Sequence, residues 1–170
     1  MSKTVFALLT VLCFTSVFAA FNPPKYSQVD SRWKNQILGF GPSTIGSAGC
    51  LLTSVSSMIA GNNVNVDGAL PNPSTMNNWL KKNGGFSGDL FVWGSISKLG
   101  FAFEGKVSNI VDIIKNYNTP GKYVILNVNQ GRHYVLATGR TNDGFNVMDP
   151  GYSKTFYKNN EIVSASIYRH

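Results

Sequence analysis

The sequence is short of the residues that form disulfide frameworks. Its 170 residues include only two cysteines and two histidines. Cys13 lies in an apolar N-terminal stretch, so a domain that begins after this stretch has one thiol, Cys50, and cannot form an internal disulfide. His170 is the last residue, which leaves His133 as the internal imidazole. If a cysteine and a histidine act together in this chain, the pair is Cys50 with His133.

Only one long hydrophobic run is present, and it lies at the N-terminus. Lys3 precedes the stretch VFALLTVLCFTSVF, and Val17 and Ala19 occupy the two key positions of a signal-peptidase site. The run is shorter than the roughly 20 residues that a membrane span needs. We therefore expect a cleaved signal peptide over residues 1–19 and a single domain over residues 20–170. That domain would have no membrane span and would be secreted, or exported to an extracytoplasmic or vacuolar compartment.

Acidic residues are also few, with eight Asp and Glu against fifteen Lys and Arg and a formal net charge of +7. The surplus favours anionic partners such as bacterial walls, acidic polymers or membrane surfaces, although an ordinary soluble surface can also be basic. The basic residues are scattered rather than clustered, so no nucleic-acid partner is expected. A monomer is expected, and neither a metal ion nor another cofactor.

The middle of the chain has helical periodicity. Residues 20–48 are rich in Gly, Pro, Ser and Asn and predict an extended arm lying over the domain. From Gly49 the apolar residues follow one helical face, which predicts a helix with Ser47 as its N-cap and Gly61 as its end. Cys50 then lies in the first turn of a helix with a buried face. Further helices are predicted over residues 74–83, 91–100 and from Ser108, the last with Ile110, Val111, Ile113, Ile114 and Tyr117 facing inward.

The final third of the chain has a period of two. This pattern predicts strands over residues 122–129, 133–139, 145–149, 154–158 and 162–169. Helices therefore come first and an antiparallel sheet second. That order predicts an α+β domain in which N-terminal helices pack on one face of a C-terminal antiparallel sheet.

The second and third predicted strands bring a histidine and a carboxylate together. A five-residue loop over residues 139–143 would place His133 directly opposite Asp149, where side chains share a face and their Cβ atoms are ~5 Å apart. A slip of one residue would abolish this match. Asp149 also precedes Pro150 and Gly151, so the alternative role of Asp149 is to start a turn. The two roles are compatible.

These residue types suit acyl transfer by a thiol. A helix N-terminus and an adjacent imidazolium would both stabilise the Cys50 thiolate. His133 would protonate the leaving group, and Asp149 would orient the ring and favour its charged form. Gly49 would let the substrate backbone approach Cys50. The alternative is that Cys50 is a small buried side chain, as free cysteines often are. The retention of a single thiol in an exported domain favours the nucleophile.

Acyl transfer also needs donors for an oxyanion. The backbone N–H of Cys50 is one, and a second could come from the side-chain amide of Gln28, Gln36 or Gln130. The sequence does not choose among the three glutamines. Loops over residues 61–74 and 83–93 are expected to border the substrate groove, with Trp93 in its lining.

Four stretches in this order resemble papain-like cysteine peptidases of the C-39-like group, which is related to the peptidase domains of bacteriocin-exporting transporters. They are YSQVDSRW (26–33), TIGSAGCLLTS (44–54), GRHYVLATG (131–139) and NVMDP (146–150). The resemblance implies a papain-like fold, Cys50 as nucleophile, His133 as base and acid, and Asp149 as the orienting residue. It also implies Gln28 as the glutamine of the oxyanion hole. In papain and the transporters that glutamine lies a few residues before the cysteine, whereas 22 positions separate Gln28 from Cys50, so the arm must fold back.

Three functions follow as hypotheses. The first is a secreted cysteine peptidase that cuts a peptide or protein substrate through a thioester acyl-enzyme. The second is hydrolysis of cell-wall peptides by a peptidoglycan endopeptidase or amidase of the same fold, which the basic charge would suit. The third is a binding protein without catalysis on the same scaffold.

Overall fold

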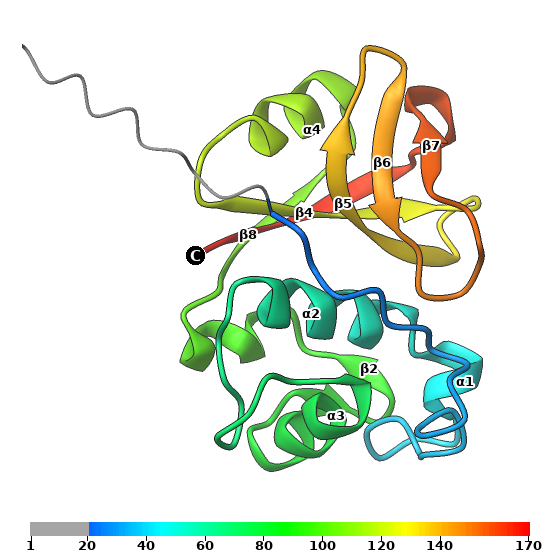
Figure 1. Cartoon of the computed structure of the whole chain (residues 1–170), viewed down its shortest axis with the longest axis vertical. Helices are drawn as coiled ribbons and strands as arrows, with labels where there is room; N and C mark the ends of the chain where they lie inside the picture. The colour runs from blue at the N-terminus through cyan, green and yellow to red at the C-terminus, as the bar shows by residue number, and fades with distance from the viewer. Residues whose placement is uncertain (1–20) are drawn as a thin grey trace, which may run out of the picture.

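The computed structural model describes residues 21–170, which form a β-sheet with helices on both of its faces (Figure 1). A helical layer from the first part of this chain packs against a six-stranded sheet that comes mainly from the second part. All strand pairs of the sheet are antiparallel. The mixed α+β class is therefore confirmed. The predicted signal peptide and residue 20 lie outside the described residues.

The helices and strands follow the predicted order. The helices are α1 (Ile45–Ala48), α2 (Cys50–Gly61), α3 (Pro73–Lys82) and α4 (Ile110–Tyr117), with the 3₁₀ helices η1 (Trp93–Leu99) and η2 (Asn159–Glu161). A small hairpin joins β1 (Phe86–Ser87) to β2 (Leu90–Phe91). The large sheet has the order β3-β8-β4-β5-β6-β7, with β3 (Ala102–Val107), β4 (Lys122–Val128), β5 (His133–Arg140), β6 (Gly144–Met148), β7 (Phe156–Lys158) and β8 (Ser164–Arg169).

Most predicted elements are present, but the smaller ones differ. The segment predicted as a helix over residues 91–100 forms the 3₁₀ helix η1, and β1, β2 and β3 were not predicted. Strand β3 lies at the edge of the sheet, and its residues alternate only between exposed and half-buried. Its register with β8 is also interrupted by a bulge between Phe103 and Gly105. Phe103 and Val107 do alternate with the exposed Glu104 and Lys106, but with a glycine between them the apolar pattern of this edge strand is weak.

Helix α2 is the central element of the helical layer. Its residues 52–60 are all buried, because the helix lies between β5 on one side and α3 on the other. Burial on every side requires the polar residues of the helix to find partners. Ser56 Oγ donates to the Leu52 carbonyl at 2.8 Å, and Ser54 Oγ donates to the Tyr134 carbonyl of β5 at 3.3 Å. The helix that begins with Cys50 is thus fixed directly to the strand that begins with His133.

The start of α2 differs from the prediction that Ser47 is its N-cap. Ser47 belongs to the preceding helix α1, where it forms a capping box with Thr44. Gly49 ends α1 and also precedes α2, so the two helices meet at a single residue. A Cβ atom on Gly49 would clash with the Ile45 carbonyl oxygen and lie 2.9 Å from Ile45 Cα. Glycine is therefore needed here for close packing of two backbones.

The N-terminal segment before α1 is attached to the domain at several points. Phe21 and Pro23 lie against Gly61 at the end of α2. Trp33 and Leu38 are almost fully buried in the core, and the Trp33 indole N–H donates to the Ser27 carbonyl at 2.8 Å. This segment, blue in Figure 1, follows the helical layer toward α1. It is a packed part of the fold, because its aromatic and aliphatic side chains contribute to the core.

Helices cover both faces of the sheet, so the prediction that they pack on one face is wrong. Helix α4 packs against β4 and β8 on the face opposite α2. Three consecutive residues of β4, Val124, Ile125 and Leu126, are at most 1% exposed. Successive side chains of a strand point to opposite faces, so both faces of β4 are buried. Residues from the two faces form two separate hydrophobic clusters.

The inward face of α4 was only partly predicted. Ile113 is fully buried, but Val111, also expected to face inward, is 66% exposed. We expect Ile113→Ala to lower the free energy of unfolding by about 2–4 kcal/mol, because it opens a cavity in the second cluster. Urea denaturation measures this change. Val111→Ala on the same helix is the matched control and should change stability by less than about 0.5 kcal/mol. Equal losses for the two variants would contradict this packing.

Candidate active site

Three distant segments bring the predicted residues together. Cys50 is the first residue of α2, His133 is the first residue of β5, and Asp149 follows the last residue of β6. Cys50 and His133 line a cavity of about 470 Å³ together with Gln28. Asp149 contacts His133 from within the fold, and its side chain is 1% exposed. The structure therefore gathers all four side chains to which the sequence assigned chemistry.

The strand register used to predict the His133–Asp149 contact is wrong by two residues. Leu136 lies opposite Met148. Continuing this register along both strands places residue 151, rather than Asp149, opposite His133. The loop between the strands is shorter than predicted, and a bulge interrupts β5. An even displacement keeps both side chains on the same face, because side chains alternate with a period of two. His133 Nε2 consequently still lies 2.7 Å from Asp149 Oδ1.

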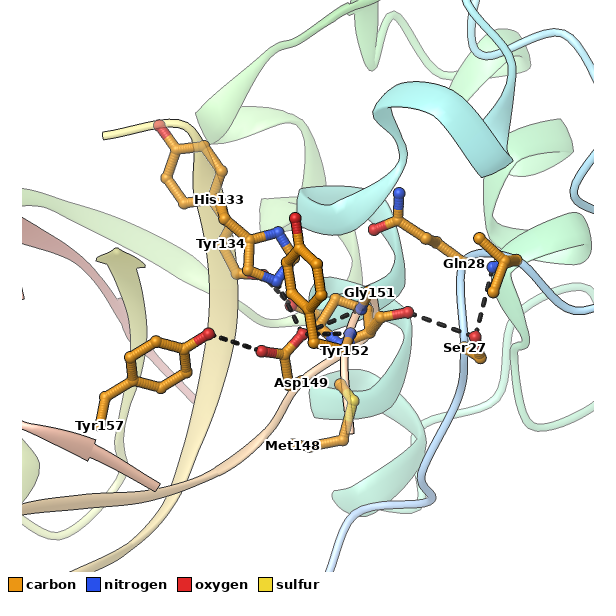
Figure 2. Close-up of polar contacts among 12 residues, drawn as sticks. Ser27, Gln28, His133, Tyr134, Met148, Asp149, Gly151, Tyr152 and Tyr157 are labelled. Carbon is orange, nitrogen blue, oxygen red and sulfur yellow. Dashed lines mark hydrogen bonds and ion pairs between the residues drawn. The ribbon is translucent and has the colours of Figure 1, made fainter. Parts of the chain in front are cut away.

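Asp149 uses both oxygens of its carboxylate (Figure 2). Oδ1 contacts His133 and accepts the backbone N–H groups of Gly151 at 2.9 Å and Tyr152 at 3.0 Å. Oδ2 accepts the hydroxyl of Tyr157 at 2.8 Å. Burial alone would raise the pKa of Asp149, but the hydrogen bonds from His133, Gly151 and Tyr157 outweigh it and hold this pKa below its usual range. The carboxylate is therefore ionised and fixed in orientation.

His133 is held in its charged form. The residue is 6% exposed, and the Tyr152 ring packs edge-on against it with centroids 5.0 Å apart. Burial is the strongest single influence and opposes the charge, but Asp149 and Cys50 together outweigh it and raise the pKa of His133 to about 9. At neutral pH both ring nitrogens then carry a proton. Because Nε2 donates to Asp149, Nδ1 is the nitrogen available to Cys50.

Cys50 is a free, half-buried thiol at the N-terminus of α2. Its helix has twelve residues, and no side chain caps the N–H groups of its first turn. Those N–H groups and the helix dipole favour an anion at this end. The thiol therefore lies between a helix N-terminus and the imidazolium of His133.

The structure separates the three candidate glutamines. Gln28 is in the cavity with Cys50, whereas the Gln36 amide donates to Ser74 Oγ at 2.8 Å. Gln130 lies in the turn between β4 and β5, where its side chain accepts from Arg132. Gln28 is thus the one of the three that lies beside the thiol.

The N-terminal segment folds back to place Gln28. The Gln28 backbone N–H donates to the Pro150 carbonyl at 2.8 Å, and its side-chain Nε2 donates to the Gly46 carbonyl at 2.9 Å. Gln28 is 9% exposed, and its Oε1 has no hydrogen-bond partner within residues 21–170. These contacts hold Gln28 in the cavity with Cys50, although 22 positions separate the two residues in the sequence. They also tie Gln28 to the same turn that follows Asp149.

Gly49 and Trp93 are outside the lining of the cavity. Gly49 is buried, and the contact with Ile45 described above accounts for its missing side chain. Trp93 stacks on Phe103 with centroids 5.4 Å apart and packs edge-on against Phe91 and Tyr134. Phe91 and Tyr134 do line the cavity. Trp93 therefore supports the wall of the groove from behind, which corrects the expectation that it lines the groove.

Two tyrosines of the site had no signal in the sequence. Tyr157, the hydrogen-bond donor to Asp149 Oδ2, comes from β7 and is 1% exposed. Tyr152 belongs to the segment after Asp149, and its ring packs edge-on against the His133 ring. Gly151 lies so close to the ring that a Cβ would be 2.9 Å from His133 Cε1. The partners of Asp149 depend on how β7 pairs with β6, which no local pattern indicates.

No family model and no curated protein matches this chain. Within residues 21–170, no helix is long and apolar enough to cross a membrane. In the same part of the chain, no group of three His, Cys, Asp or Glu side chains could hold a metal ion.

The raised pKa of His133 predicts a pH dependence of stability. The folded state keeps the imidazole proton up to about 9, whereas an unfolded chain loses it near 6.5. The contribution of His133 is thus complete below 6.5 and disappears as the pH rises to about 9, so the free energy of unfolding should fall across this range. NMR titration of the ring in a His170→Gln background, with urea unfolding alongside, tests this. A midpoint near 6.5, or the same slope in Asp149→Asn, would contradict it.

Tyr157→Phe tests the other side of the carboxylate. We expect it to lower the free energy of unfolding by about 1–3 kcal/mol at neutral pH, because it leaves Asp149 Oδ2 buried without its donor. The loss should shrink in acid as Asp149 is protonated, since the donor stabilises the ionised form. Tyr117→Phe is the matched control, because the Tyr117 hydroxyl has no hydrogen bond within residues 21–170. A loss for Tyr157→Phe that does not change with pH would contradict this role.

Proposed function

We propose that this chain is an exported cysteine peptidase, with Cys50 as nucleophile, His133 as acid and base, and Asp149 as the orienting residue. One observation carries the proposal: the ionised Asp149 holds a charged His133 beside a thiol at a helix N-terminus. A pair of this kind activates a thiol for attack on a carbonyl carbon. The ordered resemblance to papain-like peptidases of the C-39-like group supports the same proposal.

The first half of the reaction forms an acyl-enzyme. The Cys50 thiolate attacks the carbonyl carbon of the peptide bond, which forms a C–S bond and a negatively charged oxygen. His133 Nδ1 gives its proton to the nitrogen of the leaving amine as the C–N bond breaks. The products of this half are a thioester on Cys50, a neutral imidazole and a free amine.

The second half restores the enzyme. Water attacks the thioester carbon while neutral His133 accepts one of its protons. The C–S bond breaks, the thiolate and imidazolium form again, and the acyl part leaves as a carboxylic acid that gives its proton to the solvent. Throughout both halves Asp149 keeps the ring oriented without taking its proton.

Two donors are available for the charged oxygen. The backbone N–H of Cys50 is at the first position of α2, where the helix offers it no acceptor. The Gln28 amide donates one hydrogen to Gly46, and a carboxamide has a second N–H. These two groups support the oxyanion hole proposed from the resemblance.

A binding role without catalysis explains the site less well. Such a protein would not need a buried carboxylate with four hydrogen-bond partners to hold a charged imidazole beside its thiol. A buried ion pair costs desolvation free energy on folding, and shifted pKa values of this kind cluster at functional sites.

Alkylation of Cys50 by iodoacetamide, followed by mass spectrometry, tests the activated thiol first. We expect rapid labelling well below neutral pH in the wild type and slow labelling in His133→Ala. Cleavage of an unfolded protein substrate should disappear in Cys50→Ala and fall by about 10²–10⁴-fold in Asp149→Asn. Labelling that follows the titration of an ordinary free thiol would refute the proposal. Rapid labelling without peptide cleavage would refute the peptidase and leave another acyl substrate, such as a cell-wall amide.

A further inference from the structure

The cavity beside Cys50 continues past His133 into a second cavity. This neighbour has a volume of about 580 Å³ and is lined by Asn129, Gln130, Arg132, His133 and Tyr152. Arg132, His133 and Tyr152 also line the cavity that contains Cys50. A substrate that lies across the Cys50–His133 pair would therefore touch both cavities.

The two cavities differ in chemistry. The Cys50 side contains a group of apolar side chains next to polar ones such as Gln28 and Ser47, and the apolar group is Leu38, Leu51, Leu52, Phe86, Leu90 and Phe91. The one acidic residue of that lining, Asp89, accepts a hydrogen bond from Ser43. The second cavity is lined by amides, an arginine, the histidine and a tyrosine. Apart from His133, Arg132 is the one basic side chain lining either cavity.

Arg132 is available to a ligand. The residue is exposed, and none of the ion pairs within residues 21–170 includes it. Its guanidinium donates to Gln130 Oε1 at 3.0 Å, which is a neutral acceptor. Several guanidinium N–H groups therefore remain for an anion, and their planar fork matches a carboxylate.

The hairpin between β4 and β5 fixes the place of Arg132. Asn129, Gln130 and Gly131 all have positive φ, at 52°, 58° and 87°, and the Gly131 N–H closes the turn on the Val128 carbonyl at 3.1 Å. Arg132 follows this tight turn and precedes His133 directly. Its position relative to the imidazole is thus set by a short and well-defined backbone.

The proton transfer gives the substrate a direction. His133 must reach the leaving nitrogen to protonate it, so the residues after the cleaved bond lie on the His133 side of the cleft. That side contains Arg132. The residues before the cleaved bond then extend along the apolar group on the Cys50 side.

We propose that the cleft selects peptides with an apolar residue before the cleaved bond and a carboxylate within the first two residues after it, and that Arg132 recognises this carboxylate. This inference rests on the proposed peptidase function. The carboxylate can belong to an acidic side chain or to the end of the peptide, since both present the same group to the guanidinium.

Matched peptides test the preference. The set shares one sequence with an apolar residue before the cut and has Glu, Gln or Lys after it, with an amidated end. A further Gln peptide ends in a free carboxylate directly after that position. We expect kcat/KM for the Glu peptide to exceed that for the Gln peptide about three- to fivefold, the effect of an exposed ion pair. The Lys peptide should be the poorest. A gain for the free carboxylate alone would assign recognition to the chain end.

Charge reversal separates Arg132 from the general basic charge of the protein. Arg132→Glu should invert the order of the Glu and Lys peptides, whereas Lys115→Glu on α4, which makes the same change of net charge away from the cleft, should keep the wild-type order. Equal kcat/KM for the Glu, Gln and Lys peptides, or the same change in both variants, would overturn the inference.

Binding to Cys50→Ala distinguishes this inference from the peptidase proposal. Fluorescence anisotropy with the same labelled peptides measures recognition without turnover. If wild type cuts no peptide but Cys50→Ala binds the Glu peptide more tightly than Lys, the peptidase proposal fails and recognition by Arg132 stands. If cleavage occurs and neither kcat/KM nor Kd depends on the charge, the peptidase stands and the Arg132 inference fails.

Discussion

The packing of α2 against β5 is the constraint on which the site depends. The helix is buried along almost its whole length, and Ser54 fixes it to the β5 backbone at Tyr134. Cys50 and His133 are the first residues of these two elements. Because close-packed cores resist movement, the packing of these two elements holds the thiol and the imidazole beside each other. The geometry proposed for catalysis is then a consequence of the packing between α2 and β5.

A second constraint acts from the other side of the imidazole. The turn after β6 wraps two backbone N–H groups around Asp149, while its Pro150 carbonyl accepts the Gln28 N–H. One turn therefore orients the carboxylate and also fastens the segment that carries Gln28. Tyr157 closes the remaining face of Asp149. The turn and Tyr157 together fix the carboxylate that holds the charged His133 ring.

The sequence predicted the elements better than their contacts. The helix at Cys50, the later helices and the strands of the second half follow from periodicity, and single occurrences of a thiol and an internal imidazole identified the pair. The register of β5 on β6 was wrong, because loop length and a bulge are set by local turn geometry that composition does not reveal. The predicted contact between His133 and Asp149 is nevertheless present, because the register was wrong by an even number of residues and both side chains stayed on the same face.

Apolar periodicity and the presence of rare residue types are local properties, so the sequence alone determined the α+β class, the place of Cys50 in the first turn of a helix and the candidate triad. Packing between distant segments decided the rest. It placed α4 on the second face of the sheet, chose Gln28 over Gln36 and Gln130, moved Trp93 behind the groove wall and brought Tyr157 to Asp149. Each of these outcomes depends on contacts between segments that are distant in the sequence. The pattern of residues within one segment does not determine such contacts.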